Sequence, residues 1–120
     1  MRNTLALLML IICGLGCKPK ATMPAPLPVA ELPTALEKAF RVAPAETKDM
    51  AGQVVALVRA QDYSKAHPQL LTLAATPKLT HEQLDVTARG LVTLNEVLQN
   101  AQAQGDSNAA QTLEMYRRTK

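Results

Sequence analysis

Apolar side chains recur at intervals of three and four residues from Leu32 to Tyr116, and Pro, Gly or a polar turn interrupts the pattern between the runs. This spacing places the apolar residues on one side of a helix. Most of them are Ala, Leu and Val, and the chain has one Phe, two Tyr and no Trp. Good helix formers therefore outnumber the residues that favour strands. The sequence predicts an all-α fold, a small antiparallel helical-hairpin array of about four to five helices.

We expect these helices over residues 33–43, 45–60, 63–75, 81–103 and 107–117. Asp62 can cap the third helix, and Asp106 or Ser107 the fifth, because these side chains accept hydrogen bonds from the first free amides. The fourth helix has the clearest start, since Thr80 and Gln83 have the spacing of a capping box. The apolar stripe that we expect along it consists of Leu84, Ala88, Leu91, Leu94, Leu98 and Ala101.

Two residues inside the expected helices are poor helix formers. Pro68 lacks a backbone N–H and its ring clashes with the preceding turn, so we expect the third helix to bend near its N-terminal end. Gly90 costs a helix about 1 kcal/mol relative to Ala. We expect it to mark a place where a neighbouring helix approaches closely.

The first 17 residues have three successive parts. Arg2 gives a positive start, residues 5–12 are all apolar, and Gly14, Leu15 and Gly16 precede Cys17. The apolar run falls short of the roughly 20 residues that span a bilayer, and it has the length of a signal-peptide core. The segment resembles the type II signal peptide of bacterial lipoproteins, although Gly14 stands where Leu is usual. The resemblance implies that residues 1–16 are removed and that Cys17 is lipidated. An ordinary signal peptide cut nearby, or a buried N-terminal helix, is the alternative.

Residues 17–30 contain four prolines and show no helical spacing. Such a segment favours an extended, disordered tether of roughly 3 Å per residue, with a reach of about 30–40 Å. Residues 31–120 then form a single helical domain. Lys18 follows the cysteine where Asp would signal retention, so the resemblance to enteric lipoproteins implies the periplasmic face of the outer membrane.

A second resemblance lies within the helical part. Residues 61–66, followed by Leu70, Leu73 and Pro77, look like the second half of a tetratricopeptide repeat, and residues 105–110 echo the same turn. Gln61 replaces the usual Gly, and Ser107 replaces the aromatic residue. The resemblance implies stacked hairpins with a concave face that takes a partner's peptide. The alternative is any helical hairpin with an alanine-rich interface.

The reactive side chains are few and dispersed. The two histidines are His67 and His81, and His81 has one carboxylate at helical spacing, Asp85. A single pair of this kind is more typical of a surface contact than of a metal site. We therefore predict no catalytic residue, no cofactor and no metal ligand. The formal charge of +3 is too small and too evenly spread to indicate a nucleic-acid partner.

Taken together, these features predict a membrane-anchored envelope lipoprotein that is not an enzyme. Its helical domain would bind another envelope protein or act as a structural spacer, and its one modified residue would be Cys17. The alternative is a small-molecule or lipid carrier with a cavity between apolar helices. The abundance of Ala favours closely approaching helices over such a cavity.

Overall fold

The computed structural model describes residues 24–120, and this part of the chain is all-helical, as predicted. Its elements are α1 (Leu32–Ala39), α2 (Ala45–Arg59), α3 (Tyr63–Ala74), α4 (His81–Ala103) and α5 (Ser107–Arg118). The expected signal peptide, the lipidation site Cys17 and the first residues of the expected tether lie outside the described residues. The first helix is shorter than expected, because it ends at Ala39 and not at residue 43.

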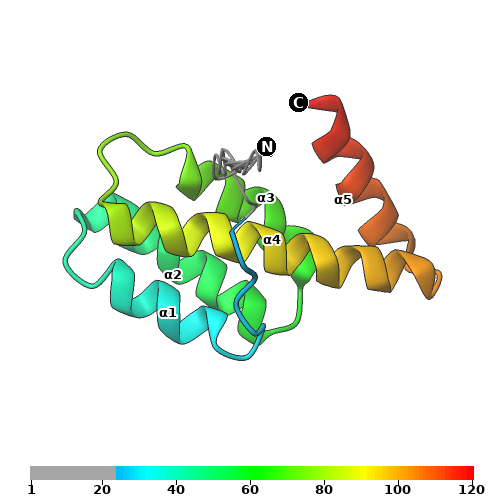
Figure 1. The fold of residues 1–120 in the computed structure, drawn as a ribbon, viewed down its shortest axis with the longest axis horizontal. Helices are drawn as coiled ribbons and strands as arrows, with labels where there is room; N and C mark the ends of the chain where they lie inside the picture. The colour runs from blue at the N-terminus through cyan, green and yellow to red at the C-terminus, as the bar shows by residue number, and fades with distance from the viewer. Residues whose placement is uncertain (1–23) are drawn as a thin grey trace, which may run out of the picture.

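The first four helices contact one another in a ring. Helices α1 and α3 each pack against both α2 and α4, whereas the backbones of α2 and α4 do not approach each other closely within the described residues. Helices α2 and α4 are therefore linked through α1 on one side of the ring and through α3 on the other. The C-terminal half of α4 extends beyond α1 and α2 and carries α5, which packs against α3 and α4 (Figure 1). The tetratricopeptide likeness of these hairpins stays a prediction.

The apolar core has two parts of unequal size. The larger part fills the ring of α1 to α4, and its fully buried side chains include Leu36, Phe40, Val54 and Leu70. The smaller part lies under α5 and consists of Leu98, Ala109 and Leu113, with Ala101 packed against it. Tyr63 contacts both parts. Because burial of apolar area is the main stabilising term, α5 is held less firmly than the other helices.

The start of α4 has the expected capping box. The Thr80 hydroxyl accepts a hydrogen bond from the Gln83 amide at 3.1 Å, and the Gln83 side-chain oxygen accepts one from the Thr80 amide at 3.0 Å. Gln83 also donates from Nε2 to the Ala39 carbonyl at 3.1 Å. The same side chain thus caps α4 and binds a free carbonyl at the end of α1.

The buried face of α4 differs from the expected stripe. Leu94 and Leu98 are buried, but Leu91 is only half-buried and Leu84 is 45% exposed. The residues of α4 that are buried are Gln83, Val86, Thr87, Gly90, Thr93, Leu94 and Leu98. Small residues occupy part of this face because α1 and α3 approach closely. A Cβ atom on Gly90 would lie 2.8 Å from Leu32 and 3.0 Å from Leu70. The expected close approach at Gly90 is therefore confirmed.

Pro68 lies inside α3, which continues on both sides of it. Because Pro68 has no N–H, the Ser64 carbonyl four residues earlier loses its helical donor. The Thr112 hydroxyl of α5 donates to that carbonyl at 3.3 Å. Pro68 thus frees an acceptor on α3 that α5 uses when it packs there.

The Pro-rich segment before α1 is attached to the domain over residues 24–30, which we call the strap. Arg89 donates from Nε to the Ala25 carbonyl at 3.0 Å, and the Thr93 hydroxyl donates to the Leu27 carbonyl at 2.6 Å. The side chains of Leu27 and Val29 pack against the larger core. Figure 1 shows the strap in blue as it crosses α4. Residues 24–30 of the expected tether are therefore held against α4 and are not a free spacer in this structure.

Candidate binding cleft

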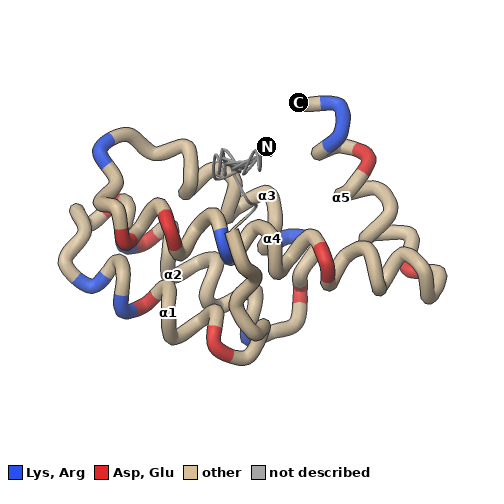
Figure 2. Tube along the Cα trace, viewed as in Figure 1, with Lys and Arg blue, Asp and Glu red and all other residues tan. Residues whose placement is uncertain are grey.

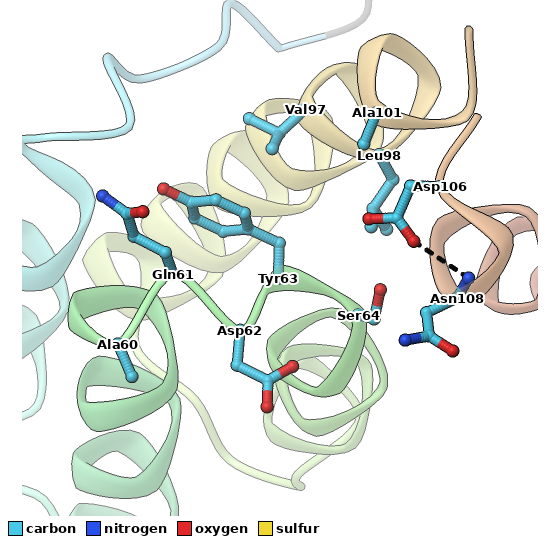
Figure 3. A pocket seen from close by; sticks show the side chains of 10 residues that line it. All are labelled: Ala60, Gln61, Asp62, Tyr63, Ser64, Val97, Leu98, Ala101, Asp106 and Asn108. Carbon is cyan, nitrogen blue, oxygen red and sulfur yellow. Dashed lines mark hydrogen bonds between the residues drawn. The ribbon is translucent and has the colours of Figure 1, made fainter. Parts of the chain in front are cut away.

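A cleft lies where the turn between α2 and α3 meets the C-terminal half of α4 and the turn before α5. It has a volume of about 370 Å³ (Figure 3). Its lining comes from two regions that are far apart in the sequence, the turn before α3 and the stretch from the end of α4 to the start of α5: Ala60, Gln61, Asp62, Tyr63, Ser64, Val97, Leu98, Ala101, Asp106 and Asn108.

Two helix starts form the polar walls of this cleft. Asp62 accepts from the Lys65 amide at 3.3 Å at the start of α3. Asp106 accepts from the amides of Asn108 and Ala109 at 2.9 and 3.2 Å at the start of α5. Both carboxylates act as N-caps, so the residues expected to cap these helices also line the cleft.

The turn before α3 has an unusual backbone conformation. Gln61 has a φ of 60°, a left-handed value that residues other than Gly seldom adopt. The Asp62 amide donates to the Leu57 carbonyl at 2.9 Å, which closes the end of α2. This turn brings Asp62 and Tyr63 to the edge of the cleft immediately after α2 ends.

The exposed lining of the cleft is mainly polar. Val97, Leu98 and Ala101 lie on the α4 side, where Leu98 is buried and Val97 and Ala101 are partly exposed. Figure 3 shows the Tyr63 ring between the start of α3 and α4. Polar groups beside a small apolar area are suited to binding through hydrogen bonds, as at the edge of a protein interface.

The charged side chains that line the cleft are acidic. Its described lining includes Asp62 and Asp106 but no Lys or Arg, and Lys65 lies next to it, 3.7 Å from Asp62. Elsewhere, acidic and basic residues are interspersed over the helices (Figure 2). At the end of α5, for example, Arg117 and Arg118 pair with Glu114 at 3.4 and 3.1 Å.

A smaller groove of about 200 Å³ lies between α3 and α5. His67 forms part of it and is 1% exposed, with its ring edge-on to Tyr116 at a centroid distance of 5.0 Å. Lys120 lies over the same Tyr116 ring, 4.6 Å from its centroid. Burial lowers the pKa of His67, because desolvation disfavours the charged imidazole. Met115, which also lines the groove, is 66% exposed.

The two histidines lie in different elements and do not form a site together. His67 is buried in α3, and His81 is exposed in the first turn of α4. Asp85, which the spacing placed beside His81, instead lies 3.7 Å from Arg89. Within residues 24–120, no group of three or more His, Cys, Asp or Glu side chains could hold a metal ion.

No family model, curated protein or solved structure matches the chain. The fold and the cleft define the class of protein as a small all-α domain, a ring of four helices with a fifth packed on its edge. Over the described residues, none of the helices has both the length and the apolar character needed to cross a membrane.

Proposed function

We propose that this chain is a bacterial envelope lipoprotein, anchored through lipid on Cys17, and that its helical domain binds another envelope protein at the cleft beside Tyr63. The anchor is supported by the resemblance of residues 1–17 to a type II signal peptide. The binding function is supported by this cleft, where the polar caps of α3 and α5 lie beside Tyr63, Val97 and Ala101.

The composition of the cleft favours a peptide segment as its ligand. Protein interfaces combine an apolar centre with a hydrogen-bonding edge, and Tyr is enriched among the residues that contribute most to binding. Tyr63 lies at the edge of the cleft next to Val97 and Leu98. The lining offers hydrogen-bonding groups from Gln61, Ser64 and Asn108 to the backbone of such a segment.

The carrier alternative requires an internal cavity between the apolar helices. The core leucines Leu32, Leu36 and Leu70 are completely buried, and Gly90 is in tight contact with two of them. Tight packing of this kind favours the protein-binding function over the carrier function. The proposed location is the outer membrane, because Lys18 follows Cys17 where Asp would signal retention.

The first experiment tests the anchor. The full-length chain and its Cys17→Ser variant are expressed in a bacterial host with labelled palmitate. We expect label on the wild type alone, in the membrane fraction. Label on neither chain would overturn the lipoprotein proposal and leave an exported helical protein.

The second experiment tests the cleft. A photo-crosslinking residue is placed at Asn108, at the edge of the cleft, and at Gln53, an exposed position on α2 outside it. We expect a discrete crosslinked protein with the Asn108 probe only, and we expect Tyr63→Ala to abolish it. Equal crosslinking at both positions would contradict a role for the cleft.

A further inference from the structure

Thr93 makes the shortest hydrogen bond between α4 and the strap. This side chain is 4% exposed, and its hydroxyl lies 2.6 Å from the Leu27 carbonyl and 3.0 Å from the Arg89 carbonyl of its own helix. A hydroxyl donates one hydrogen, and a distance of 2.6 Å is at the short end for an O–H···O bond. The hydrogen bond to the strap is therefore the better of the two.

Thr87 provides a comparison on the same helix. It is equally buried, but its hydroxyl lies 2.9 and 3.0 Å from the carbonyls of Gln83 and Leu84 in its own helix. A buried Thr on α4 can thus be satisfied locally. Thr93 differs because its shorter hydrogen bond goes to the Leu27 carbonyl of the strap. The Arg89 side chain also binds the strap, at the Ala25 carbonyl.

The strap is attached at few points. Its side chains Leu27 and Val29 are only partly buried, and a groove of about 390 Å³ remains between it and α4. This groove is lined by strap residues on one side and by Thr93, Glu96, Val97 and Asn100 on the other. Two hydrogen bonds and two partly buried side chains make an attachment that can open while the helical ring stays folded.

We propose that α4 is a docking surface for residues 24–30 and that docking of this strap sets how far the domain stands from its lipid anchor. This inference rests on the proposed lipidation of Cys17. Release of the strap adds its seven residues to the chain that separates the anchor from α1. At the polyproline rise, these residues lengthen the reach by about 20 Å.

Docking can be measured without lipid. A spin label is attached at the exposed position 26 in a chain that carries Pro26→Cys and in which Cys13 and Cys17 are replaced by Ser. We expect an immobilised spectrum, and we expect Thr93→Val to raise the ratio of mobile to immobilised label about fivefold through loss of one hydrogen bond. Thr93→Ser keeps the hydroxyl and should restore the immobilised spectrum.

Two further variants separate loss of the strap contact from a general effect on the fold. Thr87→Val removes an equally buried hydroxyl that does not touch the strap and should leave the label immobilised. Arg89→Gln weakens the contact with Ala25 from a half-buried position and should mobilise the label without loss of helical circular dichroism. A mobile label in the parent chain, or equal effects of Thr93→Val and Thr87→Val, would overturn the docking surface.

The reach is then measured with the lipidated protein in vesicles that contain an acceptor-labelled lipid. A donor fluorophore is placed on the domain at Gln53. We expect energy transfer to fall in Thr93→Val and to stay unchanged in Thr87→Val. A mobile strap with unchanged transfer would overturn the effect on reach. Absence of lipid on Cys17 would instead overturn the proposed function, and the spin-label result would still stand.

Discussion

His67 illustrates how burial gives a single residue a pH-dependent effect. Its ring is enclosed between α3 and α5, and desolvation lowers its pKa from the ordinary value of 6.5. The unfolded chain binds a proton at this residue near pH 6.5, whereas the folded chain resists it. The stability that neutral His67 contributes is therefore present above pH 6.5 and is lost as the pH falls below that value. The sequence shows His67 only as a neighbour of Pro68, since its burial depends on α5.

We accordingly predict that the free energy of unfolding decreases as the pH falls from 7.5 to 5.5, and that His67→Phe removes most of this decrease. Urea unfolding at several pH values measures it. His81→Gln is the control, because His81 is exposed and its replacement should leave the slope unchanged. An identical pH dependence in the wild type and His67→Phe would show that other groups cause it.

Substitution by Ala should have opposite effects on stability at the two helical glycines, Gly90 and Gly52. Gly90→Ala places a Cβ 2.8 Å from a methyl group of Leu32 and 3.0 Å from one of Leu70, and both leucine side chains are fully buried. We expect it to lower the free energy of unfolding by about 1–3 kcal/mol through overpacking. Gly52→Ala meets no atom within 4 Å and should raise stability by up to about 1 kcal/mol through helix propensity. Denaturant midpoints of the two variants check this, and stabilisation in both would contradict the close approach at Gly90.

At the scale of elements, the helix starts could be predicted from the sequence better than the buried faces could. Thr80, Gln83 and the caps Asp62 and Asp106 act within one turn, so local sequence is enough to identify them. The buried face of α4 depends on where α1 and α3 lie. Thr87 and Thr93 are buried there because carbonyl groups satisfy their hydroxyls, which a count of apolar residues does not reveal. The cleft could not be predicted for the same reason, since its two regions meet only in the fold.

Because the buried face of α4 differs from the expected one, the leucine of α4 that contributes most to stability also differs. The expected stripe placed Leu91 in the core, but Leu91 is half-buried and Leu94 is completely buried. We predict that Leu94→Ala lowers the free energy of unfolding by about 2–5 kcal/mol through cavity formation. Leu91→Ala should cost clearly less. Both values come from denaturant unfolding, and an equal cost at the two positions would contradict the observed orientation of α4.

At the scale of the whole molecule, the division of the core into two parts implies two levels of stability. The ring of α1 to α4 encloses the larger cluster, whereas α5 packs Ala109 and Leu113 against Leu98 of α4 in the smaller one. The hydrogen bond from Thr112 to Ser64 and the edge-on contact of His67 with Tyr116 add a few polar and aromatic contacts. Because the cleft lies between α4 and the start of α5, opening of α5 would also change the shape of the proposed binding site.

We therefore predict that the amides of α5 exchange with solvent through a local opening that costs less free energy than opening of the ring. Leu113→Ala should lower the opening free energy of α5 and leave that of α2 nearly unchanged, because Leu113 contacts only the smaller cluster. Leu70→Ala, in the larger cluster, should lower both. Native-state hydrogen exchange measures these values residue by residue. If Leu113→Ala lowered the protection of α2 as much as that of α5, the two clusters would unfold as one unit, and the cleft would be as rigid as the ring.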